Sequence, residues 1–191
     1  MASSVVVAVC DACILYPFHL RNIVVQASVD RLFDARWSEQ IHGEWMRNLL
    51  ANAPGLTLDR LEVAKRLMNV ALPAATVAGY EKHIPTITLP DADDRHVVAA
   101  AIEAKASHIL TWNLRDFPAE ALKSHGLVCQ TPDAFLADIY DRTPLLVLGS
   151  LAHARRNLSR SAMSADAFLD MLRDQKLTQL HSRLKNHIGD L

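Results

Sequence analysis

The chain has little of what marks several common protein classes. Aromatic residues make up only 6% of its 191 residues, and its three cysteines lack the number and spacing of a disulfide framework. Lys and Arg number 20 against 21 Asp and Glu, so there is no overall positive field, and contact with nucleic acid would need a local patch. The sequence has no apolar run long enough to cross a membrane.

The N-terminal sequence also lacks the pattern of a secretory signal, because no basic residue precedes its short apolar run. We therefore expect a first strand there and a cytoplasmic protein. Cys10 and Cys13 form a C-x-x-C pair, but Cys10 ends a predicted strand, whereas redox pairs begin a helix. Cys129 alone cannot complete a zinc site with them. We expect all three cysteines to be structural.

Hydrophobic residues make up half of the chain, and their spacing predicts alternating strands and helices. Residues 5–10 form a continuous apolar run, as in a parallel strand covered on both faces. Every connection is long enough to cross over, so we predict an α/β fold, with a parallel sheet of about four strands sandwiched by helices. The other strands are predicted at 86–88, 108–111 and 127–130, and helices at 17–34, 38–51, from 57, 73–82, from 95 and 131–140.

Polar side chains follow the predicted strand ends, where ligands of α/β proteins bind. A single aspartate at a helix start is explained by capping, but three within four residues exceed what one cap needs. Carboxylates without a matching Lys or Arg imply a bound cation, and oxygen ligands favour Mg²⁺ or Mn²⁺ over zinc. The residues concerned are Asp11, Asp91, Asp93, Asp94, Asn113 and Asp116.

In their order along the chain, these residues resemble the PIN-domain ribonucleases, and in particular the VapC-type toxins of bacterial toxin–antitoxin pairs. The resemblance spans roughly residues 4–140. It rests on Asp11 after the first strand, Glu44 in an early helix, D-D-R-H-V-V-A-A-A from Asp93, and I-L-T-W-N-L-R-D-F ending at Phe117.

The resemblance implies a catalytic metal site for Mg²⁺ or Mn²⁺ formed by Asp11, Glu44, Asp94 and Asp116. It also implies that Thr111 orients the first aspartate, while Asn113 stands where many members have another aspartate. Helix geometry alone does not choose between Glu44 and Glu39, and Asp91 and Asp93 remain alternative ligands.

The implied activity is metal-dependent endoribonuclease cleavage by a toxin, with RNA as substrate and an antitoxin as protein partner. The antitoxin would cover the acidic groove, insert a cation such as Arg, and contact the helices at 17–34 and 38–51. The alternative is a non-catalytic PIN-fold binding or regulatory module. A dehalogenase-type phosphatase would need an aspartate where Cys13 stands, and a receiver domain would need a lysine after a late strand, where Trp112 and Asn113 stand.

Residues 143–191 differ in charge from the rest. They hold seven Lys and Arg against four Asp, a net charge of +3, which leaves −4 for residues 1–142 within the total of −1. We predict a nuclease domain over 1–142 and a C-terminal helical extension over 143–191, with helices at 145–158, from 164, and at 176–187. The extension either contacts RNA phosphates, through Arg155, Arg156 and Arg160, or only packs against the core. A homodimer is left open.

Overall fold

The computed structural model describes residues 5–159 and 161–191. A four-stranded sheet lies at its centre, in the order β2-β1-β3-β4, and every neighbouring pair of strands is parallel. Strand β1 pairs with a strand on each side, so that Val9 lies opposite Arg36 of β2 and opposite Ile109 of β3. The predicted fold class is therefore confirmed. The strands are β1 (Val7–Cys10), β2 (Asp34–Arg36), β3 (His108–Leu110) and β4 (Val128–Gln130).

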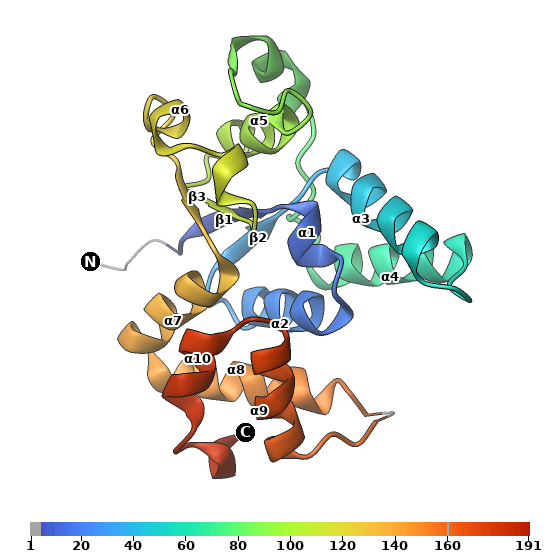
Figure 1. The fold of residues 1–191 in the computed structure, drawn as a ribbon, viewed down its shortest axis with the longest axis vertical. Helices are drawn as coiled ribbons and strands as arrows, with labels where there is room; N and C mark the ends of the chain where they lie inside the picture. The colour runs from blue at the N-terminus through green and yellow to red at the C-terminus, as the bar shows by residue number, and fades with distance from the viewer. Residues whose placement is uncertain (1–4, 160) are drawn as a thin grey trace.

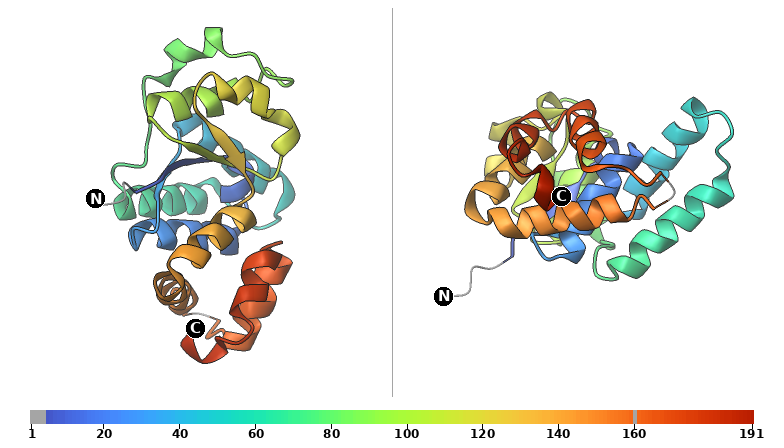
Figure 2. Two further views of the ribbon diagram at one scale, coloured as in Figure 1. Left: turned by 90° about the vertical axis from the view of Figure 1, so that its left-hand side faces the viewer. Right: turned by 90° about the horizontal axis from the view of Figure 1, so that it is seen from below.

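Helices cover both faces of the sheet. In Figure 1 the layers run from α5 and α6 at the top, through the sheet, to α2 and α7, and then to α8, α9 and α10 at the bottom. Figure 2 shows the same layers from the side. The α-helices are α1 (Ala12–Leu15), α2 (Phe18–Val29), α3 (Glu39–Asn52), α4 (Leu58–Ala71), α5 (Arg95–Glu103), α6 (Ala119–Lys123), α7 (Pro132–Arg142), α8 (Pro144–Arg156), α9 (Ala165–Asp174) and α10 (Thr178–Leu184), with 3₁₀ turns at Tyr80–Thr86, Leu114–Asp116 and Ile188–Asp190.

Helix starts follow the capping residues that the sequence supplies. The side-chain oxygens of Ser38, Thr57, Thr131 and Ser164 each accept a hydrogen bond from the backbone N–H three residues later. Pro132 occupies the first turn of α7, where the missing N–H costs nothing. The predicted starts of these helices are confirmed.

Three expectations about the elements are wrong. Residues 86–88 form no strand, because the chain there leaves a 3₁₀ helix and only Ile87 turns into the core. The sheet instead includes β2, which begins at Asp34, the last residue of the helix predicted over 17–34. That helix ends at Val29 because Arg31 adopts a left-handed conformation with φ 60°. The helix predicted over 73–82 is replaced by a 3₁₀ helix that begins at Tyr80.

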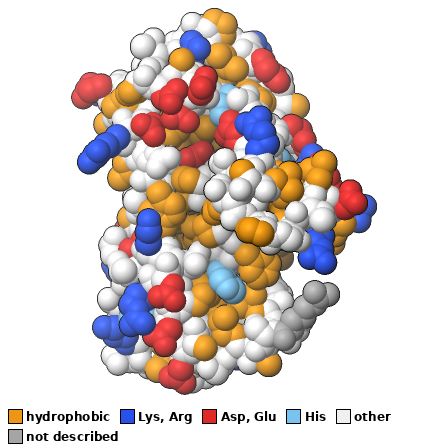
Figure 3. Space-filling model, turned by 45° about the vertical axis from the view of Figure 1, so that its right-hand side comes forward, with side chains coloured by type: hydrophobic (Ala, Val, Ile, Leu, Met, Phe, Trp, Pro, Cys, Tyr) orange, Lys and Arg blue, Asp and Glu red, His pale blue; other side chains and the backbone are white. Residues whose placement is uncertain are grey.

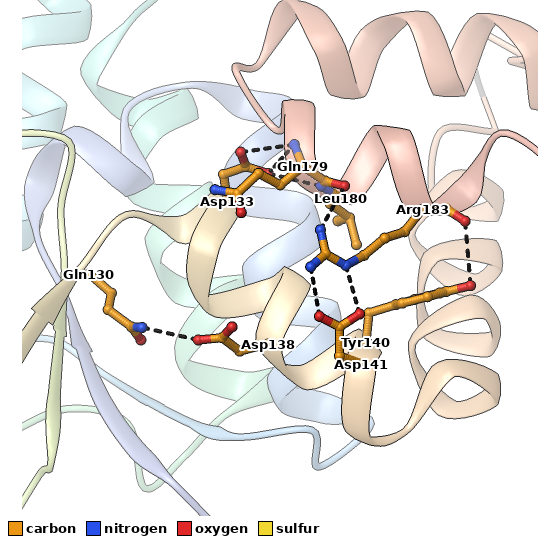
Figure 4. A network of polar contacts seen from close by, with 8 residues as sticks. All are labelled: Gln130, Asp133, Asp138, Tyr140, Asp141, Gln179, Leu180 and Arg183. Atoms are coloured by element: carbon orange, nitrogen blue, oxygen red, sulfur yellow. Dashed lines mark hydrogen bonds and ion pairs between the residues drawn. The ribbon is translucent and has the colours of Figure 1, made fainter.

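The C-terminal helices attach to α7 through a polar network (Figure 4). Asp133, which is buried in the first turn of α7, accepts hydrogen bonds from the backbone N–H groups of Gln179 and Leu180 at 3.0 Å. Two turns further along, Asp141 pairs with Arg183 of α10. The division at residue 142 stays a prediction, since α7 packs against both α8 and α10.

Of the described helices, none is both long and apolar enough to cross a membrane.

Candidate active site

Asp11 lies at the centre of the candidate site. It directly follows β1, is only 6% exposed, and accepts hydrogen bonds from Ala12 N at 2.6 Å and from the Thr111 hydroxyl at 2.6 Å. The ion pairs of the described residues include none to Asp11. Since a buried carboxylate without a cation is costly, this position suits a bound metal ion.

The loop after β3 fixes the orientation of Asp11. Thr111 is fully buried, and its hydroxyl oxygen accepts a hydrogen bond from Asn113 N at 3.0 Å while its proton goes to Asp11 Oδ2. The family resemblance implied that Thr111 orients Asp11, and this geometry suits that role. Asn113 lines the same cavity as Asp11.

Asp94 immediately precedes α5 and also lines this cavity. Its partial burial, together with the negative charges of Asp11, Asp116 and Asp91, raises its pKa to about 6. The carboxylates are therefore near enough to repel one another, and a divalent cation bound among them would relieve that repulsion.

Glu44 reaches the cavity from α3, where its carboxylate lies 2.9 Å from Nε2 of His96. His96 is only 3% exposed, and its Nδ1 has no partner among the described atoms. A proton on Nδ1 would be buried without an acceptor, so we assign the ring proton to Nε2, from which it is donated to Glu44. His96 was not among the residues predicted for the site.

The cavity has a volume of about 500 Å³ and opens to solvent. Figure 3 shows acidic side chains gathered on the upper part of the face that it presents. The sequence analysis did not predict Asn48 and Asn52 as site residues. They follow Glu44 at intervals of four along α3, so all three side chains lie on the same face of that helix. The lining residues are Asp11, Ala12, Cys13, Tyr16, Glu44, Asn48, Asn52, Asp93, Asp94 and Asn113.

Asp116 and Asp91 stand at the margin of this arrangement. Asp116 lines an adjoining cavity of about 470 Å³, which shares Asn113 with the first. Asp91 accepts a hydrogen bond from Asp93 N at 2.8 Å and so stabilises its own turn. Glu39, the alternative to Glu44, pairs with Lys65 at 2.7 Å instead. The structure thus brings Asp11, Glu44 and Asp94 to one cavity, with Asp116 beside it.

The donor set fits a hard divalent ion. Among the described residues, no group of three or more His, Cys, Asp or Glu side chains is arranged to hold a metal ion by itself. Mg²⁺ does not need such a group, because it keeps several waters and takes only one or two carboxylates directly. The carboxylate and amide oxygens that line the cavity are ligands of the kind that Mg²⁺ and Mn²⁺ prefer.

The thiols take no part as nucleophiles. Burial, reinforced by the charge of Asp11, raises the pKa of Cys13 to about 12, so it stays protonated and donates to Asp11 Oδ2 at 3.1 Å. Cys10 is fully buried, and neither of these thiols nor that of Cys129 forms a disulfide.

Of the three arginines predicted to contact RNA, Arg155 and Arg156 line neither cavity of the site. Arg155, on α8, donates to the backbone oxygens of Met163 at 2.9 Å and Leu191 at 3.1 Å, so its guanidinium is engaged inside the C-terminal region. Arg156 is exposed on the same helix, and Arg160 lies outside the described residues. Contact with RNA stays a prediction for these positions.

Comparison with known proteins gives three matches. The PIN domain family model matches residues 4–115, and the model of the VapC50 C-terminal domain matches residues 132–186. A curated protein of Mycobacterium tuberculosis (strain ATCC 25618 / H37Rv), named "Putative ribonuclease VapC50", is 43% identical over 60 residues. That alignment covers 29% of this chain and 36% of the relative, so the match spans about a third of the relative's length. No solved structure matches the chain.

The PIN model covers more than half of the chain, and it includes Asp11, Glu44, Asp94 and Thr111. The second model covers α7 and most of the helices that follow it. The chain belongs to the PIN domain family, and its C-terminal region matches the model of the VapC50 C-terminal domain.

Proposed function

We propose that the protein is a metal-dependent endoribonuclease that acts as the toxin of a toxin–antitoxin pair. The observation that carries the proposal is the meeting of Asp11, Glu44 and Asp94 in one open cavity of a PIN fold. No Lys or Arg forms an ion pair with any of them within the described part of the chain. Such a concentration of negative charge favours a divalent cation and, through it, a phosphate group.

Asp11, Glu44 and Asp94 would hold Mg²⁺ or Mn²⁺, with Asp116 at the margin. A bound ion would lower the pKa of water and offset the charge that builds on the phosphoryl group. Thr111 and Ala12 N fix the two oxygens of Asp11, and His96 fixes one oxygen of Glu44, which leaves its other oxygen for the ion. These contacts would fix the ligands before the ion binds.

RNA is the proposed substrate, because the curated relative is named as a ribonuclease. The proposed protein partner is an antitoxin that covers the acidic cavity and inserts a cation there. A second, more apolar cavity of about 410 Å³ between α2 and α4 supports this partner, since it is lined by the exposed residues Phe18 and Leu67. The predicted contact surface included α2, and the cavity adds α4 to it.

The test of the activity is replacement of Asp11 by Asn, which removes the charge at nearly constant shape. We expect RNA cleavage in Mg²⁺ or Mn²⁺ to be lost in Asp11→Asn, and EDTA to act on the parent protein in the same way. Asp59→Asn is the matched control, because Asp59 is exposed in the first turn of α4 and lines neither cavity at the site. Circular dichroism checks that both variants fold.

Cleavage by Asp11→Asn at the parent rate would refute the metal mechanism. A parent protein that binds Mn²⁺ but leaves RNA intact under all conditions would instead favour the non-catalytic binding module.

A further inference from the structure

The C-terminal region reaches the loop of the candidate site at one described contact. Lys176, in the turn between α9 and α10, holds its Nζ 5.9 Å from the centre of the Trp112 ring. Trp112 lies between Thr111, which orients Asp11, and Asn113, which lines the acidic cavity. In Figure 1 this turn lies on the side of the C-terminal region that faces the sheet.

Trp112 also lines the adjoining cavity. This cavity is lined by residues 112–116 and meets the acidic cavity at Asn113. Arg115 is exposed on its wall, and Lys176 is exposed beside Trp112. Neither cation takes part in an ion pair within the described ranges. Two cations and a partly exposed indole thus lie at the loop after β3, whose Asn113 lines the acidic cavity.

The backbone at Lys176 is unfavourable for a lysine. Its φ is 62°, in the left-handed region, where it closes α9 with hydrogen bonds from Lys176 N to Arg173 O and from Leu177 N to Leu172 O, both at 2.9 Å. Glycine is the residue that normally occupies this position of the motif, because a Cβ is strained there. The side chain is exposed, so burial does not offset the strain. Lys105 has the same backbone conformation, with φ 51°, so what sets Lys176 apart is its contact with Trp112.

We propose that Lys176 and Arg115 form a phosphate-binding subsite for the RNA strand next to the acidic cavity, with the Trp112 ring holding Lys176 in place. The inference rests on the proposed nuclease function and extends it. The phosphates beside the scissile one meet the negative field of the aspartates, and cations at the edge of the cavity offset that repulsion. Lys176 would bring part of the positive charge of residues 143–191 to the strand.

The test is Lys176→Gly, which removes the charge and also relieves the backbone. Lys105→Gly is a closely matched control, because Lys105 closes α5 with φ 51° and the same pair of backbone hydrogen bonds. Lys105 is exposed and lies at the end of α5 opposite Asp94. Both variants lose one positive charge from the same kind of helix end, but only Lys176 contacts the loop after β3.

Binding is measured by fluorescence anisotropy, with a labelled single-stranded RNA oligonucleotide of mixed sequence, in EDTA and over a range of salt. We expect Lys176→Gly to weaken binding about threefold or more at low salt and to make the salt slope shallower by about 0.7, as for one lost phosphate contact. Lys176→Arg should keep the slope of the parent, and Lys105→Gly should match the parent throughout. Thermal melting should show Lys176→Gly to be at least as stable as the parent.

An unchanged salt slope in Lys176→Gly, or an equal loss of affinity in both glycine variants, would overturn the subsite. The cleavage assay of the Asp11 experiment separates this result from the main proposal. A parent protein that cleaves RNA while Lys176→Gly binds normally leaves the nuclease function standing and refutes the subsite. A slope that depends on Lys176 in a protein that never cleaves RNA supports the subsite and refutes the nuclease.

Discussion

Replacing Asp133 with alanine should destabilise the protein by about 3 kcal/mol, because α10 begins on this carboxylate. The residue before α10, Leu177, provides no side-chain cap. Asp133 supplies the missing acceptor from α7, with Gln179 N and Leu180 N at 3.0 Å and the Thr178 hydroxyl at 3.3 Å. Asp133 as a residue is 5% exposed, so little water reaches it in the folded protein.

The magnitude follows from these donors. Leaving a buried donor without an acceptor costs about 1–3 kcal/mol, and losing a helix cap costs about 1 kcal/mol. Leu180 is fully buried, whereas Gln179 is exposed and can recover part of the loss from water. Asp133→Asn keeps one carbonyl acceptor, and we expect it to lose about half as much free energy of unfolding as Asp133→Ala does.

The assay is equilibrium unfolding in urea. Asp166→Ala is the matched control, because Asp166 is an exposed acid in the first turn of α9, a helix that has its own cap at Ser164. Its loss should cost less than about 1 kcal/mol, the value of a charge–dipole interaction at a helix start. If Asp133→Ala were no less stable than Asp166→Ala, the cap would not hold α10, and the reasoning would be refuted.

Three further predictions concern single side chains. His96→Phe should weaken Mn²⁺ binding about tenfold in calorimetry, because Glu44 loses its donor, whereas His96→Gln should largely restore it; equal affinities in both would exclude positioning by His96. Burial lowers the pKa of His42 to about 4, so the unfolded state binds the proton first as pH falls. The free energy of unfolding should be full above about pH 6.5 and decline by about 3 kcal/mol down to pH 4. His42→Gln should reduce this decline when unfolding is measured as a function of pH. Arg155→Gln should lower the melting temperature and Arg156→Gln should not, because only Arg155 donates to backbone oxygens of the C-terminal region; equal melting temperatures would contradict this.

The sequence predicted the central part of the sheet because hydrophobic runs determine buried parallel strands. Cys10 ends such a run, and Asp11 follows it in the structure as expected. The strand at Asp34–Arg36 could not be found in this way, since only Ala35 of its three residues is buried. Its pairing with β1 gives it strand geometry, and pairing between distant segments leaves no periodic signal in so short a piece.

The site was predictable at strand ends and less so on helices. Asp11 and Asn113 follow strands, so the rule for parallel sheets predicts them at one edge, whereas the role of Thr111 came only from the family resemblance. Glu44 depended on a family resemblance, because helix geometry alone did not separate it from Glu39. The contact from His96 to Glu44 joins two helices, and no sequence pattern within either helix predicts it. The inward orientation of Arg155 likewise depends on backbone oxygens of other segments, those of Met163 and Leu191, and no local pattern predicts it.

The hydrogen bonds of Asp133 also bear on the order in which the protein is assembled during synthesis. Asp133 precedes Gln179 by 46 residues, so it leaves the ribosome well before the N–H groups that it will bind. Until Thr178, Gln179 and Leu180 arrive, the carboxylate must stay hydrated, and the burial seen in the folded structure cannot yet exist. Docking of α10 is therefore a late event, and with it the turn that carries Lys176 reaches the loop after β3. A newly made chain would acquire its acidic cavity first and the charge of Lys176 beside it last.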